Sequence, residues 1–458
     1  MGGSHSHAPS AARDSDHEIG ASAGVRTALF AAVALITFGV LFGLGLLWPR
    51  GPLPPSARQA VTYAGGTIQS AQVTSVTTAS CPGTSDNRLP DGTIPTTVTC
   101  VTVQARLSDG DRTGAVVSVP VSPQIYQAGI RSGDRINVVR YPQAAGQPDA
   151  YSWVDFSRDL PLGVLGVIFA VLVVAVARLR GVAALVGLGL GYLTVLKFML
   201  PALQRGENGA AVAFVGSVAI MIVLLYVAHG VSAKTTTALL GTVAGLAVTA
   251  GLAVWASGAV HLNGLTSEDN YTLSMLTGTS LSGIILCGIV VAGLGVLNDV
   301  TVTQASAVWE LHASAPHLGA GRLFAAGMRI GRDHLASTVY TIAFAYAGVA
   351  MPTLLLIDLY RQPLHLVLSS GDIAEEIART LVGAIGLVLA IPLTTGIAAI
   401  VVSRNATDRA IRHLRRPAPE GDAPAVAHAT DAPRAFPAYR LDPSYPQDQS
   451  RPQGTSLL

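Results

Sequence analysis

Long apolar segments recur along this chain, and they limit its possible folds more than any motif does. A helix needs about 20 consecutive apolar residues to cross about 30 Å of hydrocarbon. The apolar segments are continuous and rich in Ala, Gly, Leu and Val rather than alternating, which favours helices over the strands of a barrel. The sequence therefore predicts an all-α polytopic membrane bundle of about eight transmembrane helices, at residues 27–48, 160–177, 182–203, 209–228, 237–260, 273–297, 335–356 and 381–402.

Composition and charge agree with a lipid bilayer as the main environment. Half of the residues are hydrophobic (50%) and only 12% are charged, whereas about 25% are charged in soluble domains. Basic residues in short connections tend to stay on the cytoplasmic side of a membrane. With both termini cytoplasmic, the basic connections around Arg178, Lys234 and Arg322 and the tail from Arg404 all fall on that side. We therefore expect eight crossings with cytoplasmic N and C termini.

Residues 49–159, between the first two apolar segments, predict a small extracytoplasmic β-rich domain. Residues 97–104, 115–121 and 134–139 are rich in β-branched side chains and are separated by turn signals such as Arg131-Ser132-Gly133-Asp134. A small barrel or a sandwich fits this pattern. Cys81 and Cys100 lie in this domain, and outside the cytoplasm such a pair favours a disulfide over a metal site. The domain is also the expected contact surface for a protein partner.

The remaining parts of the chain complete the expected domain organisation. Residues 1–26 and 404–458 are polar or proline-rich with few large apolar residues, which predicts disordered cytoplasmic ends. Residues 27–48 form the first transmembrane helix, and residues 160–403 form a domain of seven transmembrane helices.

One group of polar residues follows the sixth apolar segment and precedes the seventh. On a helix, Asp299, Thr303 and Glu310 share one face, because they are separated by four and seven residues. Residues 321–333 predict an amphipathic helix at the membrane surface that bends into the seventh span. The candidate polar cluster consists of Asp299, Thr303, Glu310, Arg329, Arg332, Asp333 and His334.

Two interpretations of this cluster remain open at this stage. In the first, Asp299 and His334 line the mouth of a cation or proton pathway, with hydroxyl oxygens such as those of Thr301 and Thr338 as ligands. In the second, the charges form a network of salt bridges and helix caps that fixes a cytoplasmic elbow. A histidine beside an aspartate at the start of a helix fits either interpretation.

Two segments carry a resemblance to a known family. Gly293-Leu294-Gly295-Val296-Leu297-Asn298-Asp299-Val300-Thr301-Val302-Thr303-Gln304 and Arg329-Ile330-Gly331-Arg332-Asp333-His334 are similar to the signature segments of the YibE/F-like bacterial multi-pass membrane proteins. The resemblance covers roughly residues 100–403 and implies a multi-pass protein of the bacterial plasma membrane. Where the family pattern has Asp-Asp before Val-Thr-Val-Thr, this chain has Asn298-Asp299.

Enzyme motifs are missing from the sequence. It contains no His-Glu-x-x-His, no Gly-x-Ser-x-Gly and no Gly-x-x-x-x-Gly-Lys-Ser/Thr. We therefore expect no enzymatic activity, no catalytic residues, no cofactor, no metal and no nucleic-acid partner. The expected function is that of a secondary transporter or channel for a small solute or ion. The alternative is a non-catalytic membrane scaffold or assembly protein that acts through its outer domain.

Overall fold

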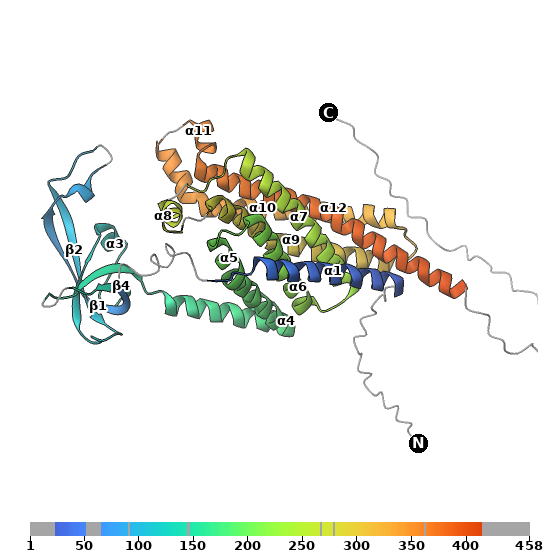
Figure 1. Ribbon diagram of the computed structural model, residues 1–458, viewed down its shortest axis with the longest axis horizontal. Coiled ribbons are helices and arrows are strands. Elements are labelled where there is room, and N and C mark those ends of the chain that lie inside the picture. Colours follow the sequence, from blue (N-terminus) through green and yellow to red (C-terminus); the bar gives the residue numbers. More distant parts are fainter. Residues whose placement is uncertain are drawn as a thin grey trace, which may run out of the picture. The chain divides into compact units, whose positions relative to one another are not determined.

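The computed structural model describes residues 23–51, 66–89, 92–143, 147–265, 268–277, 280–360 and 363–414 (Figure 1). The expected disordered ends lie outside these residues, except for residues 23–26 and 404–414, which are helical. The described chain is mostly helical and has one small β domain near its N-terminus.

The β domain is a single five-stranded antiparallel sheet in the order β3-β2-β1-β4-β5. The strands are β1 (Thr67–Pro82), β2 (Thr97–Leu107), β3 (Val116–Val121), β4 (Arg135–Tyr141) and β5 (Ala150–Phe156). The three segments predicted from the sequence coincide largely with β2, β3 and β4. Strand β1 was not predicted, because its Ser, Thr and Gln residues hide the strand pattern, and β5 was not predicted either.

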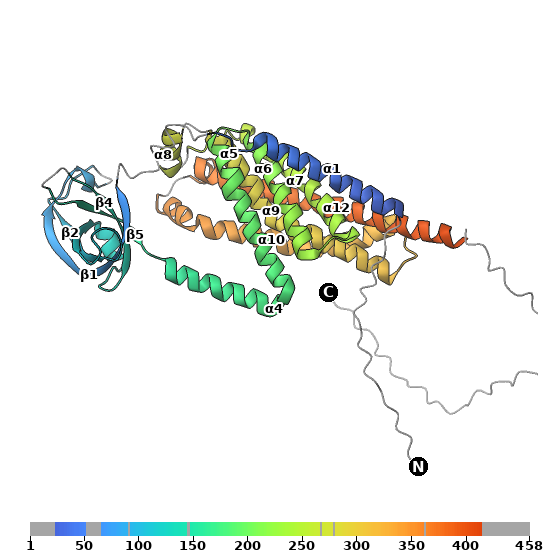
Figure 2. The same ribbon diagram turned by 60° about the horizontal axis from the view of Figure 1, so that its bottom comes forward.

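Side-chain alternation gives this sheet its core. Val103, Ala105 and Leu107 on β2 are buried together with Ile136 and Val138 on β4, as expected when successive side chains point to opposite faces. The sheet curls on itself rather than packing on a second sheet (Figure 2), so a partly open barrel replaces the predicted choice between barrel and sandwich. A disulfide joins Cys81 on β1 to Cys100 on β2, with 5.8 Å between their Cα atoms. Two short helices, η1 (Ser85–Asn87) and α3 (Pro123–Gln127), complete the domain.

Three charged residues, Arg112, Arg140 and Asp149, form a cluster beside the connection between β4 and β5. Arg140 Nε donates a hydrogen bond of 2.7 Å to Asp149, and Arg112 lies 3.4 Å from the same carboxylate. Desolvation alone would raise the pKa of Asp149, but the hydrogen bond from Arg140 and the two guanidinium charges outweigh it. The pKa of Asp149 therefore lies below its usual value, and the carboxylate stays charged at neutral pH.

Seven helices among the described residues are long and apolar enough to cross a membrane. Six of these candidate spans match long helices, namely α1 (Ala23–Leu47), α6 (Gly209–His229), α7 (Ala233–Ala259), α9 (Leu281–Ser314), α10 (Ala320–Tyr360) and α12 (Gly371–Leu414). The seventh is the helical run Asp159–Gln204, made of α4 (Asp159–Thr194), the π-helical turn η2 (Val195–Met199) and α5 (Leu200–Gln204).

The run Asp159–Gln204 contains the second and third predicted spans. At 46 residues it is about twice as long as one crossing requires. Arg178 interrupts the helical backbone with φ 54° and ψ −129°, between the two apolar segments predicted from the sequence. Figure 2 shows a sharp turn of the chain within α4. The break is compatible with two crossings, and the count of eight stays a prediction.

Two features of the helices differ from the sequence prediction. The sixth span begins at Leu281 instead of residue 273, because α8 (Glu268–Thr277) is a separate short helix. The predicted bend after residue 333 is absent, and α10 continues unbroken through it. Within this continuous stretch, Gly331 is buried where an added methyl group would overlap Ile391 of α12. The remaining helix, α11 (Leu364–Leu368), is short and lies just before α12 in the chain.

Helices α6, α7 and α9 form the centre of the bundle. Buried apolar residues from all three make one core cluster, which includes Met221, Leu246 and Ile289, and α1 and α12 add to it. In contrast, α4 before Arg178 and the second half of α10 expose large apolar side chains such as Phe169, Phe344 and Val349. A membrane would cover these surfaces without further protein contacts.

Candidate functional site

Asp299 and His334 lie close together, as the sequence interpretation required. Asp299 on α9 and His334 on α10 are separated by 3.6 Å between Oδ2 and Nε2, which is too long for a hydrogen bond. The Asp299 side chain is 68% exposed and that of His334 is 34% exposed. Even with the histidine protonated, a largely exposed pair of this kind contributes between about 0 and 1 kcal/mol to stability. The pair therefore contributes little to the stability of the fold.

Among the described residues, no ion pair joins the other members of the predicted cluster to Asp299 or His334. Thr303 and Glu310 are exposed on α9, and Arg329, Arg332 and Asp333 are exposed on α10. In the part of the chain that the structure describes, His334 is the one basic side chain within 4 Å of the Asp299 carboxylate. The predicted hydroxyl ligand Thr338 donates to the backbone carbonyl of His334, inside its own helix. The structure thus brings Asp299 and His334 together and leaves the remaining charges at the surface.

The buried polar residues of α9 lie on a different face of the helix. Thr301 is two residues after Asp299, about 200° around the helix, and it is fully buried. Gln304 is 3% exposed, and its amide donates a 2.8 Å hydrogen bond to the carbonyl of Gly327 on α10. The polar stripe chosen from the sequence is therefore the exposed one. The neighbouring residues Thr301 and Gln304 make the contacts between helices.

Buried threonines of α7, α9 and α12 meet at the contact between these helices, which lie side by side (Figures 1 and 2). Thr242 on α7 and Thr301 on α9 share a 2.6 Å hydrogen bond between their hydroxyl oxygens. All five side chains of this group are 0% exposed. We call this group the threonine seam, and it consists of Thr242, Thr249, Thr301, Thr394 and Thr395.

Glycines let the helices approach closely along the seam. A methyl group added to Gly386 on α12 would overlap the hydroxyl of Thr249, and one added to Gly241 on α7 would overlap that of Thr394. Gly327 on α10 faces the methyl group of Thr395 in the same manner. Small residues at such positions are typical of helix contacts in membranes. The hydroxyls of Thr249 and Thr394 therefore lie directly against the backbone of the facing helix.

The hydroxyl groups of the seam differ in their hydrogen-bond partners. Those of Thr249 and Thr395 donate to the carbonyl four residues earlier in their own helices. Thr394 Oγ1 is buried and has no hydrogen-bond partner among the described residues. Two residues before it, Pro392 lies inside α12 and lacks the N–H that would normally donate to the carbonyl of Val388. This part of α12 therefore holds unused hydrogen-bonding capacity in an apolar bundle.

The threonine seam was missed in the sequence because single threonines in apolar helices carry little signal. The spacing of Gly241, Thr242, Gly245 and Thr249 by one, three and four residues does place small and polar side chains near one face of α7. Chemically, the seam offers neutral oxygen atoms and no charge. Among the described residues, no group of three or more His, Cys, Asp or Glu side chains is placed to hold a metal ion.

These features describe a protein of apolar helices with a buried polar contact and a small β domain, which is the construction of a multi-helix membrane protein. A family model of the YibE/F-like proteins matches residues 165–404, just over half of the chain. The protein belongs to the YibE/F-like family.

The match places the family's common part in the helices from α4 to α12. The resemblance predicted from the sequence began near residue 100, but the match begins at residue 165 and leaves the β domain outside. No curated protein and no solved structure matches the chain.

Proposed function

We propose that this protein is a secondary transporter or channel for a small solute or ion in a bacterial plasma membrane, acting without chemistry of its own. The threonine seam carries the proposal, because five buried threonines lie where α7, α9, α10 and α12 meet in an otherwise apolar bundle. Oxygen atoms in such positions can replace part of the water shell of a passing solute. In this proposal the seam is the closed pathway, and Asp299 and His334 lie at its cytoplasmic mouth.

Opening the pathway would require α12 to move away from α7. Pro392 supports such a motion, since a proline inside a helix removes one backbone hydrogen bond and weakens the turn before it. The glycine contacts support it as well, because Gly241 and Gly386 present no side chain that would interlock with α12 or α7. The proposal includes eight crossings with both termini in the cytoplasm, since this arrangement keeps the basic connections inside.

A double substitution separates transport from simple helix adhesion. Thr242→Val together with Thr301→Val replaces both partners of the 2.6 Å hydrogen bond by apolar groups of similar shape, which is nearly neutral or even stabilising. The fold should therefore survive while the polar pathway is interrupted. We expect flux of H⁺, Na⁺, K⁺ or butylammonium into vesicles containing the wild-type chain, and at least a tenfold lower flux with the double variant.

Thr237→Val is the matched control for this experiment. Thr237 is buried on the same helix, but its hydroxyl donates to Ala233 of its own helix and is not part of the seam. This control should retain wild-type flux and a wild-type unfolding temperature. Equal flux in the wild type, the double variant and protein-free vesicles would contradict the proposal. Loss of a crosslinked partner after deletion of the β domain would then favour the scaffold function.

A further inference from the structure

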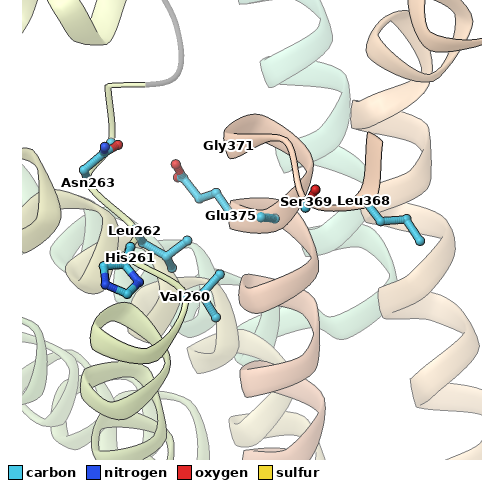
Figure 3. A pocket seen from close by; sticks show the side chains of 10 residues that line it. Val260, His261, Leu262, Asn263, Leu368, Ser369, Gly371 and Glu375 are labelled. Atoms are coloured by element: carbon cyan, nitrogen blue, oxygen red, sulfur yellow. The ribbon is translucent and has the colours of Figure 1, made fainter. Parts of the chain in front are cut away.

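A pocket of about 460 Å³ lies at the end of the bundle where α7 ends and α12 begins (Figure 3). One wall is the segment from Val260 to Gly264, which follows α7, and the other is the segment from Leu368 to Glu375. Its volume falls in the range of about 300 to 1,000 Å³ that is typical of small-molecule sites. The pocket is distinct from the threonine seam and from Asp299.

The charge around the pocket is negative. The carboxylate of Glu375 extends from α12 toward the 260–263 segment in Figure 3, and its side chain is only 13% exposed. Arg379 binds both Glu375 and Glu376, at 2.7 Å and 2.9 Å. Two carboxylates therefore share this single guanidinium, and a third acidic residue, Asp372, lies in the first turn of α12. A second cation near Glu375 would therefore be attracted.

Acidic residues in the first turns of a helix also stabilise its N-terminus, so their presence alone does not define a site. Asp372 is exposed and can fulfil that role from the surface. Glu375 is one turn further and largely withdrawn from water, which is costly for a carboxylate unless charged partners compensate. Arg379 pairs with two carboxylates at once, so these three side chains together carry a net negative charge at the pocket wall when all are ionised.

The opposite wall is held in a fixed conformation. His261 has φ 53° and Gly264 has φ 74°, and both belong to the left-handed region that most residues avoid. Leu262 is buried and its N–H donates to the carbonyl of Ser257, while Gly264 packs against Leu281 and Ile285 of α9. Asn263 and the neighbouring backbone therefore already face the pocket near Glu375. Little conformational entropy would be lost when a ligand binds, which favours binding.

We infer that this pocket binds a small organic cation, with its ammonium group at Glu375 and its apolar part against Val260, Leu262 and Leu368. Polar groups of Asn263 and Ser369 lie on the same walls and can orient the ligand. The volume exceeds what a bare metal ion would fill, and the lining combines one carboxylate with several aliphatic side chains. The inference rests on the proposed function only in that the bound cation would be the solute that is transported.

Binding can be measured without transport. The purified full-length chain in detergent is titrated at pH 7 with butylammonium, and with 1-butanol and butyrate as neutral and anionic probes of similar size, while calorimetry records binding. We expect saturable binding of butylammonium alone. Glu375→Gln should weaken it roughly 10- to 100-fold, since a charge-assisted hydrogen bond is lost. Asp372→Asn, the same change one turn away on the exposed surface, should stay within about twofold of wild type.

Glu375→Gln removes one charged partner of Arg379 and could therefore misfold. A second variant that leaves this ion pair intact keeps the test conclusive. Leu368→Trp fills the pocket from a side chain that is 48% exposed, so the fold should tolerate it, and binding should be lost. Equal affinity for butylammonium and butanol, or unchanged affinity in the two pocket variants, would overturn the inference. Binding by the wild type without flux into vesicles would instead refute the proposed transport function and leave the binding site intact.

Discussion

At the scale of single residues, Gly386 and Gly383 on α12 form a natural pair for comparison. A methyl group at position 386 would overlap the hydroxyl of Thr249, whereas one at position 383 would meet no atom within 4 Å. Alanine is normally favoured over glycine inside a helix by about 0.5 to 1 kcal/mol. We therefore expect Gly383→Ala to be neutral or stabilising. Gly386→Ala should destabilise the bundle by about 1 to 3 kcal/mol, the usual cost of overpacking.

Thermal unfolding of the two variants in the same detergent measures this difference. Gly386→Ala should unfold at a lower temperature than the wild type, and Gly383→Ala at the same or a higher temperature. Equal unfolding temperatures would mean that α7 and α12 are not in contact at this level. A combined Gly386→Ala, Thr249→Ala variant should recover part of the loss, because the overlapping hydroxyl is then removed.

The residue scale also marks the limit of what the sequence predicted. The sequence offered Arg329, Arg332 and His334 as candidate partners of Asp299, and the structure places His334 at 3.6 Å from it. The burial of Thr301 and Gln304 was not predicted. Thr301 is only two residues after Asp299, but on a helix its side chain points about 200° away from that of Asp299. Which face of a helix is buried depends on its neighbours, and an apolar helix in a membrane gives no amphipathic pattern to reveal them.

At the scale of elements, the hairpin of β1 and β2 has two unlike halves. Ala71 and Val73 of β1 are buried in the sheet, but no residue of this strand is buried beyond Val73. The outer half is held by the strand ladder and by the disulfide between Cys81 and Cys100. We expect Cys81→Ser together with Cys100→Ser to fray this half while the inner half stays ordered.

Hydrogen exchange of the full-length chain tests this expectation. Amides of residues 79–81 and 97–100 should exchange faster in the double variant, and those of residues 71–73 and 103–107 should be unchanged. Reduction of the wild-type disulfide should give the same pattern. Uniformly faster exchange across all five strands would show instead that the disulfide stabilises the whole domain.

Elements were predicted well where one physical signal dominates. The apolar segments located the long helices, because the length needed to cross a bilayer is a strong constraint. Two predictions about the helices were wrong. The sixth span was predicted to begin at residue 273, but α9 begins at Leu281, and a bend was predicted after residue 333, where α10 is continuous. Strand β1 was missed because its solvent-facing Ser and Thr residues lack the apolar alternation that identified β2 and β4.

At the scale of the whole molecule, the number of crossings decides the side on which each connection lies. The run Asp159–Gln204 would be about 69 Å long as a straight helix, more than twice the hydrocarbon thickness. With a reversal at Arg178 it supplies two crossings, and Asp358 at the end of α10 then lies outside with the β domain. With one crossing, Asp358 lies in the cytoplasm and the basic connections around Lys234 and Arg322 lie outside, against the usual preference.

Cysteine labelling distinguishes the two arrangements. Asp111→Cys in the β domain, Asp358→Cys and Lys234→Cys are each treated with a membrane-impermeant maleimide in intact cells and again after permeabilisation. We expect positions 111 and 358 to react in intact cells and position 234 only after permeabilisation. The native Cys287 is buried and serves as the unreactive background. Labelling of position 234 without permeabilisation, together with protection of position 358, would establish seven crossings. It would also place Asp299 and His334 on the outer side, so that the proposed cytoplasmic mouth would have to be abandoned.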